Sequence, residues 1–248
     1  MMAFIVQARI GSTRLPKKMI LPFYNGKGIL ELLIQKLKIH FPSIPIVLAT
    51  TEEENDTTIA ELGKKEKIKV FRGSEKNVLE RFIKAAEKHK ISKIIRICAD
   101  NPFLDMKALQ ILIEKFDHAQ LDYLAFCTSD GKPSIKTHFG FWAEGVSLNA
   151  LKKVRHQTES PIYLEHVTNF IYEKKNGFKL KFIRIPSEVE IFDIRLTVDT
   201  QEDFEITKEI YAKSQEKGIS GTKEIVKFVS SNYDWMCRMQ NQIERNEK

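Results

Sequence analysis

The sequence predicts an α/β protein in which helices cover both faces of a mostly parallel central sheet. Short apolar runs, typical of buried strands, alternate along the first half of the chain with stretches whose apolar residues recur at helical spacing. Polar and charged residues follow several of these runs directly, which is where ligands bind in open parallel sheets. With 248 residues, 42% of them hydrophobic, the chain is long enough for one large domain over residues 1–248.

The strand-like runs of the first half are short and mostly apolar, as expected of strands in a sheet that helices cover on both faces. They lie at residues 4–6, 46–49, 70–71, 94–98 and 123–127. Helical periodicity is clearest between them, at residues 29–37, 79–86 and 109–116. This order of elements predicts parallel strands joined by helical crossovers.

The pattern changes after about Ser129, where a turn over residues 130–133 precedes an aromatic stretch, His138–Ala143, that we expect to be a strand. Helices are expected over residues 147–157 and 161–174, and the alternation at 178–182 indicates a half-buried strand. Thr200 is a candidate N-cap for a helix that continues through Ile210, and a final helix spans roughly residues 222–231. The polar tail, residues 238–248, is expected to fray.

Composition excludes several classes of protein. The chain has no apolar run of membrane-spanning length and no signal-peptide layout, and its three cysteines are too scattered for a disulfide framework or a zinc site. We therefore expect a cytoplasmic protein without a membrane partner. The net charge is +7, but the lysines are interleaved with glutamates and no aromatic–basic RNA-binding motif is present. Nucleic acid is therefore not an expected partner.

The loop that follows the first strand has the chemistry of a polyphosphate site. It carries four cations, Arg9, Arg14, Lys17 and Lys18. Its small residues, which provide backbone freedom and hydroxyl donors, are Gly11, Ser12 and Thr13. Cations and donors at the end of a first strand suit a bound phosphate chain. Neither the GxGxxG nor the GxxxxGK[ST] fingerprint is present, which disfavours dinucleotide binding and the Walker A cradle.

Two aspartates could hold a metal ion beside such a ligand. Asp100 follows the strand-like run at 94–98, and Asp199 precedes Thr200. A bound triphosphate needs a divalent cation, and Mg²⁺ prefers one or two carboxylates together with phosphate oxygens. A role in a turn or a helix cap is the alternative for each aspartate.

Residues 8–18 match, without a gap, the loop Ala-Arg-x-Gly-Ser-Thr-Arg-Leu-Pro-x-Lys of the cytidylyltransferases, which are sugar nucleotidyltransferases. From Phe4 to about Ile210 the chain resembles the spore-coat polysaccharide biosynthesis group, whose more distant relatives activate KDO and sialic acids. The matching segments occur in the expected order at 71–74, 78–82, 99–102, 165–168 and 197–200. The resemblance implies a three-layer α/β/α nucleotidyltransferase fold of Rossmann-like type. It also implies a small inserted strand–helix region on the acceptor side, at about 130–195, that would form a homodimer.

The resemblance further implies an Mg²⁺-dependent enzyme that transfers CMP from CTP to a sugar or sugar acid, with release of pyrophosphate, for surface polysaccharide synthesis. The catalytic residues would be Arg9, Lys18, Asp100 and Asp199, with both aspartates holding Mg²⁺. The nucleotide-binding residues would be Gln7, Ala8, Arg9, Gly11, Ser12, Arg14, Lys18, Thr50, Arg72, Gly73, Ser74, Ala99 and Asp100. The acceptor-binding residues would be His138, Glu165, His166 and Arg195.

The acceptor side departs from the family pattern. Relatives carry a Gly-Leu-Asp-x-Glu-like segment where this chain has the aromatic stretch 139–145, with its acid displaced to Glu144. The acceptor of relatives therefore does not transfer directly. Local residues also leave the base of the nucleotide open. A glycosyltransferase would need an Asp-x-Asp pair after a strand, which the chain lacks. A non-catalytic nucleotide- or RNA-binding protein is the remaining alternative and would show steeply salt-dependent nucleic-acid binding.

Overall fold

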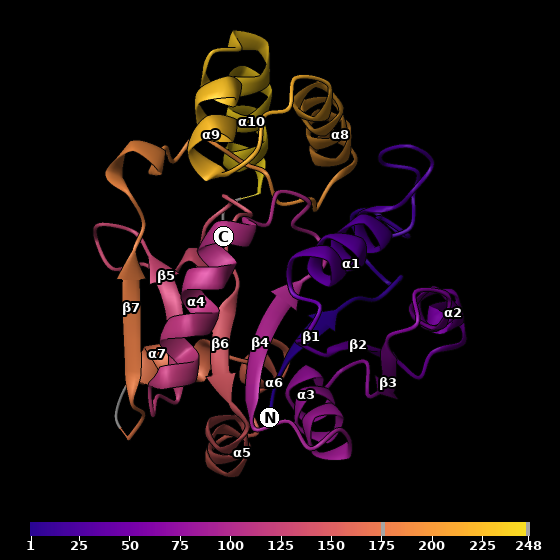
Figure 1. Cartoon of the computed structure of the whole chain (residues 1–248), viewed down its shortest axis with the longest axis vertical. Coiled ribbons are helices and arrows are strands. Elements are labelled where there is room, and N and C mark those ends of the chain that lie inside the picture. Colours follow the sequence, from indigo (N-terminus) through magenta and orange to yellow (C-terminus); the bar gives the residue numbers. More distant parts are fainter. Residues whose placement is uncertain (175–176, 247–248) are drawn as a thin grey trace.

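The computed structural model describes residues 1–174 and 177–246. Within them, seven strands form one sheet in the order β3-β2-β1-β4-β6-β5-β7 (Figure 1). The strands are β1 (Met2–Gln7), β2 (Ile46–Thr51), β3 (Lys69–Gly73), β4 (Lys93–Cys98), β5 (Tyr123–Cys127), β6 (Glu144–Ser147) and β7 (Leu180–Arg184). Only β6 runs antiparallel to its neighbours within this sheet. The prediction of a mostly parallel sheet is confirmed.

Helices cover both faces because successive side chains of each strand point to opposite sides. Phe4 and Val6 of β1 pack into one hydrophobic cluster, and Ala3 and Ile5 pack into the other. The first cluster is covered by α1 (Ile29–His40), α4 (Met106–His118), α8 (Gln201–Glu216), α9 (Thr222–Ser230) and α10 (Tyr233–Arg245). The second is covered by α3 (Val78–Lys88), α5 (Leu148–Gln157), α6 (Pro161–Glu165) and α7 (Asn169–Lys174). The remaining α-helix of the described residues, α2 (Thr57–Lys65), packs against β2 and β3.

The direction in which the chain crosses the sheet reverses beside β1. The chain passes from β1 outward through β2 to β3 and then returns to β4 on the other side of β1. At the carboxyl ends, Gln7 is level with Cys98 of β4 and Ala49 of β2. Such a reversal opens a crevice for ligands outside the strand ends. In Figure 1 the helices α8, α9 and α10 gather at the end of the molecule toward which β4 points.

Two expectations for the second half of the chain are wrong. The stretch His138–Ala143 is irregular and pairs with no strand of the described residues, and β6 begins only at Glu144. Its backbone instead packs against Leu196 and Thr197, and the His138 carbonyl accepts a hydrogen bond from Leu196 N at 2.8 Å. The helix expected over 161–174 is broken into α6 and α7, because the backbone leaves the helical conformation at His166 (φ −97°, ψ 75°). Between the two helices the buried Thr168 donates its hydroxyl to Glu144 at 3.2 Å.

The tail also differs from the expectation that residues 238–248 fray. Residues up to Arg245 form α10, whose Trp235 and Met239 are buried in the core and whose Gln242 is buried as well. These three positions recur at helical spacing, but the residues between them are mostly polar. The buried face of the helix is therefore too narrow to be recognised in the sequence. Residues 247–248 lie outside the described residues. Among the described residues, none of the helices combines the length and the apolar character that a membrane span requires.

Candidate active site

The loop after β1 is anchored by its apolar residues and by one buried carboxylate. Ile10 and Leu15 are buried, and the Ile10 amide donates to Asp56 Oδ1 at 2.6 Å. Asp56 also accepts a short hydrogen bond from the Thr51 hydroxyl at the end of β2. These contacts fix the loop at the carboxyl edge of β1 and β2, with Arg9, Gly11 and Arg14 left at least partly accessible.

Lys18 brings together the two aspartates that the sequence singled out. Its ammonium lies 3.3 Å from Asp100 Oδ2 and 3.3 Å from Asp199 Oδ1, and it also donates to the Val198 carbonyl. The Lys18 residue is only 6% exposed. Burial alone disfavours the charged ammonium, but the two carboxylates outweigh this effect and raise the pKa of Lys18 above its ordinary value. Arg14 adds a second cation, 3.3 Å from Asp199 Oδ1.

Comparison with known proteins identifies the family of this chain. Residues 3–246 match the family model described as cytidylyltransferase. The chain belongs to the cytidylyltransferase family. It is therefore a nucleotidyltransferase, with the α/β fold of that family.

Two relatives of this cytidylyltransferase, and one more distant structure that shares its fold, are similar to it over most of their length. Spore coat polysaccharide biosynthesis protein SpsF of Bacillus subtilis is 33% identical over 93% of this chain and 95% of its own length. The structure of a cytidylyltransferase from Leptospira borgpetersenii superposes with a TM-score of 0.83 at 30% identity, covering 95% of this chain and 96% of that one. CMP:2-keto-3-deoxy-manno-octonic acid synthetase, solved with CTP, shares the fold with a TM-score of 0.64 at 13% identity, covering 86% and 99%.

Two predicted nucleotide-binding side chains of the cytidylyltransferase end in buried oxygens that have no hydrogen-bond partner within the described residues. They are Gln7 Oε1 and Thr50 Oγ1, at the carboxyl ends of the adjacent strands β1 and β2. Ala8 and Ala99 flank them, and their amides are used by the sheet, donating to the Ala49 and Gln7 carbonyls. A buried polar atom without a partner is costly, so these two positions suit a polar ligand such as a nucleotide.

The predicted nucleotide-binding residues at the end of β3 are placed differently from the loop after β1. Arg72 donates to the Thr51 carbonyl at 2.8 Å, to the Glu53 carbonyl at 2.7 Å and to Thr57 Oγ1 at 3.2 Å. Its guanidinium therefore binds the loop between β2 and α2. Gly73 leaves no room for a side chain, because an added Cβ would lie 2.9 Å from the Phe71 ring.

Arg9 lies between two carboxylates from segments that are far apart in the sequence but border the same face of the sheet. Its guanidinium is 3.6 Å from Glu75 Oε1, in the turn before α3, and 3.8 Å from Glu165 Oε1, at the end of α6. An added Cβ at Gly11 would lie 3.3 Å from the same Glu75 oxygen. The predicted acceptor residue Glu165 thus meets the predicted phosphate residue Arg9 across the crevice. Its neighbour His166 is exposed at the end of α6.

Arg195 is placed to hold Asp199. It is buried and donates to Asp203 Oδ1 at 2.7 Å, to Asp203 Oδ2 at 2.8 Å and to Asp199 Oδ2 at 3.2 Å. It also contacts His138 Nδ1. Burial disfavours its charge, but Asp203 and Asp199 outweigh this and raise the pKa of Arg195. The structure thus places Arg195 behind the Lys18 cluster.

Sequence reasoning missed two features of the site. Arg81 of α3 is buried, with its Nη1 donating to the Ser74 carbonyl at 2.7 Å, while its Nε and Nη2 have no hydrogen-bond partner in the described chain. Burial is the main reason that its pKa falls to about 10. The second feature is a small cavity of 80 Å³ beside Asp100. Unpartnered buried oxygens of Asn101, Ser134 and Thr197 belong to residues that line it.

Proposed function

We propose that this cytidylyltransferase transfers CMP from CTP to a sugar or sugar acid, with release of pyrophosphate, in polysaccharide synthesis. The observation that carries the proposal is the Lys18 ammonium between Asp100 and Asp199, directly beside the loop of residues 8–18. The name of SpsF, which points to polysaccharide synthesis, supports the biological role. The cytidylyltransferase family match supports CTP as the nucleotide.

Asp100 and Asp199 fit a magnesium ion, because in this structure they already converge on one cation, the Lys18 ammonium. No group of three or more Cys, His, Asp or Glu side chains that could hold a metal occurs among the described residues. The remaining ligands would therefore be phosphate oxygens and water, as Mg²⁺ prefers. When bound, Mg²⁺ would neutralise negative charge on the phosphates.

The chain's own residues would contribute positioning and positive charge. In the proposed reaction an acceptor oxygen forms a bond to the α-phosphorus of CTP, and the bond from that phosphorus to the departing pyrophosphate breaks. Negative charge then grows on the pyrophosphate. Lys18, Arg9 and Arg14 surround the crevice and would stabilise this charge, which is where fixed cations accelerate a reaction most.

The 80 Å³ cavity beside Asp100 supports a hydroxylated acceptor. Its three unpartnered oxygens can each accept a hydrogen bond, and the Ser134 and Thr197 hydroxyls can also donate one. A hydroxyl-bearing end of a sugar would satisfy them, whereas an apolar acceptor would leave them buried and unpaired. Glu165, 3.8 Å from Arg9, and its neighbour His166 are further proposed acceptor contacts.

Thermal unfolding with CTP, UTP, GTP and ATP, each with and without Mg²⁺, tests the nucleotide. A ligand that binds only the native state raises stability by about 2.7 kcal/mol at a hundred times its Kd. We expect the largest shift with CTP and Mg²⁺ together. A larger shift with another triphosphate would overturn CTP, and no shift with any of the four would overturn the site itself. Pyrophosphate release screened over sugars and sugar acids then identifies the acceptor.

A further inference from the structure

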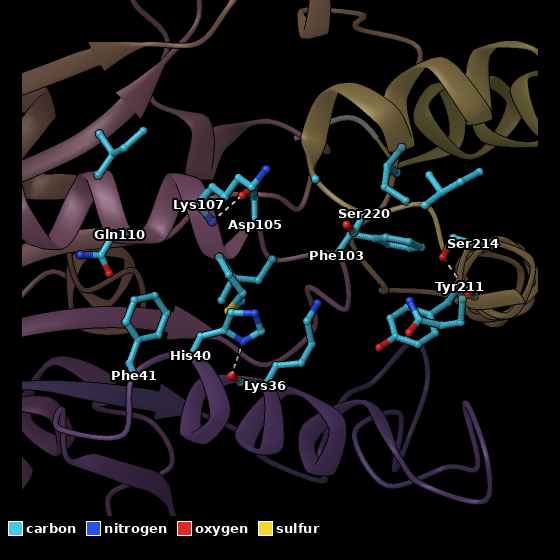
Figure 2. A pocket seen from close by; sticks show the side chains of 17 residues that line it. Lys36, His40, Phe41, Phe103, Asp105, Lys107, Gln110, Tyr211, Ser214 and Ser220 are labelled. Atoms are coloured by element: carbon cyan, nitrogen blue, oxygen red, sulfur yellow. Dashed lines mark hydrogen bonds between the residues drawn. The ribbon is translucent and has the colours of Figure 1, made fainter. Parts of the chain in front are cut away.

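A second and larger cavity lies on the α1–α4 face of the molecule, where these helices meet α8 and the start of α9 (Figure 2). Its volume of 670 Å³ is within the range of small-molecule sites, about 300–1,000 Å³. Its walls are largely aromatic and aliphatic, including Phe41, Phe103, Met106, Tyr211 and Ile225. None of the residues that line it belongs to the Lys18–Asp100–Asp199 cluster.

The cavity contains a cation that the rest of the described chain does not pair. Lys36 of α1 is half-buried and directs its side chain into the cavity (Figure 2). Among the described residues, no hydrogen bond or ion pair reaches its ammonium, and burial lowers its pKa. The carboxylate that acts on it electrostatically is that of Asp105. An ammonium that is partly withdrawn from water and has no partner is unfavourable, so an anion bound beside it would be stabilised.

Asp105 cannot serve as that partner without giving up contacts of its own. Its Oδ1 accepts from the Lys107 and Ala108 amides, at 2.8 Å and 3.0 Å, and thereby caps α4. Its Oδ2 accepts from the amide and the hydroxyl of Thr222, at 2.8 Å and 2.5 Å, and thereby ties α9 to α4. The hydrogen bonds of the Asp105 carboxylate thus stabilise the fold and occupy both of its oxygens. Lys107 and His40 add basic groups at the rim.

We propose that this cavity binds a small amphipathic carboxylate, with its apolar body against the aromatic and aliphatic walls and its carboxylate on the Lys36 ammonium. The charge selects the anion, because a neutral apolar ligand would bury Lys36 further without pairing it. The apolar walls favour a ligand with an apolar body, because a small hydrophilic anion would leave these walls in contact with water. The proposal does not depend on CTP or on the acceptor, and binding can be measured without turnover.

Calorimetric titration with three probes tests both requirements. Octanoate has the apolar body and the charge, 1-octanol has the body alone, and acetate has the charge alone. A charge-assisted hydrogen bond in a desolvated site predicts that octanoate binds at least about tenfold more tightly than 1-octanol. We expect no measurable binding of acetate. Equal affinity for octanoate and 1-octanol, or no binding of octanoate, would overturn the proposal.

Three variants locate the binding site. Lys36→Met keeps the aliphatic stem and removes the charge, and should bring octanoate to the affinity of 1-octanol. Lys115→Met makes the same change at an exposed position on α4 outside the cavity and should preserve the tenfold preference. Gln110→Trp places a bulky side chain at the exposed rim and should weaken both probes. A preference that survives in Lys36→Met or binding that survives in Gln110→Trp would place the probe elsewhere.

A second copy of the chain is the competing occupant, and sedimentation of the wild type with and without octanoate separates the two. If the cavity is a dimer interface, Gln110→Trp will shift the protein toward monomer and octanoate will not bind the wild-type dimer, and the small-acid proposal fails. If octanoate binds with an unchanged sedimentation coefficient, the proposal stands.

Discussion

Lys18 is a buried lysine whose charge balances two carboxylates at once. Removing that charge leaves Asp100 and Asp199 without the cation that they share, although Arg195 and Arg14 still lie 3.2 Å and 3.3 Å from Asp199. We expect Lys18→Met to lower the rate of pyrophosphate release by at least about 10²-fold, by analogy with the loss of a single stabilising donor in other enzymes. Lys64→Met, at an exposed position on α2, is the matched control and should keep wild-type turnover. Unchanged turnover in Lys18→Met would remove Lys18 from the mechanism.

Arg195 differs from Lys18 because it acts through Asp199. Its guanidinium contacts Asp203 with two nitrogens and Asp199 with one of them, a geometry that a lysine ammonium cannot reproduce. We expect Arg195→Lys to raise the Mg²⁺ concentration needed for half-maximal activity by about 10–100-fold, as for other residues that orient a metal ligand. Thermal unfolding of the same variant provides the comparison. Lower stability with an unchanged Mg²⁺ requirement would make Arg195 a purely structural residue.

At the scale of elements, α10 supports the site from behind. The Arg195 amide lies 3.4 Å from Met239 Sδ, and the Thr200 hydroxyl donates to Gln242 Oε1 at 3.0 Å. The helix thus holds both ends of the segment that contains Asp199. The sequence predicts a frayed tail here because polar residues dominate it. The contacts that order it come from segments about forty residues away.

Met239→Ala measures this support. Met239 is buried in the core. Replacing such a methionine with alanine typically lowers the free energy of unfolding by about 2–5 kcal/mol. We expect a loss in that range by denaturant unfolding. Glu244→Ala, at an exposed position of the same helix, should change the free energy by no more than about 0.5 kcal/mol. Equal effects of the two substitutions would mean that α10 does not pack as described.

Elements that depend on local signals were predictable, and contacts between elements were not. The apolar runs of β1 and β4 predict buried parallel strands, and Thr200 does cap α8, with its hydroxyl accepting from Asp203 N. The hydrogen bonds of Arg72 to the Thr51 and Glu53 carbonyls exist only because β3 lies beside β2. The residues next to Arg72 in the sequence do not indicate these hydrogen bonds. The aromatic stretch 138–143 resembles a strand for the same reason, since burial without strand pairing has the same apolar pattern.

The site itself is a property of the whole molecule. Its parts come from residues 8–18, from Asp100 after β4 and from Asp199 before α8. The reversal of strand order beside β1 brings the first two together, and the return of the chain to α8 adds the third. The sequence could predict that residues at strand ends converge, because that follows from parallel topology. It could not predict that Lys18 would be the residue that joins the aspartates.

At the scale of the whole molecule, exposed apolar side chains indicate how two copies of the chain would associate. The region 130–195, where the family resemblance implies a dimer contact, exposes Ile162 by 55% and Phe192 by 57%. We propose that a second copy of the chain covers these side chains, because burying them would remove apolar surface from water. The double variant Ile162→Glu/Phe192→Glu should therefore sediment as a monomer at concentrations where the wild type is a dimer. Ile39→Glu, at an equally apolar position on α1 that is 75% exposed, is the control and should remain dimeric. A wild type that sediments as a monomer, or a double variant that remains dimeric, would contradict this assignment, and dissociation by Ile39→Glu alone would move the interface to the α1 face.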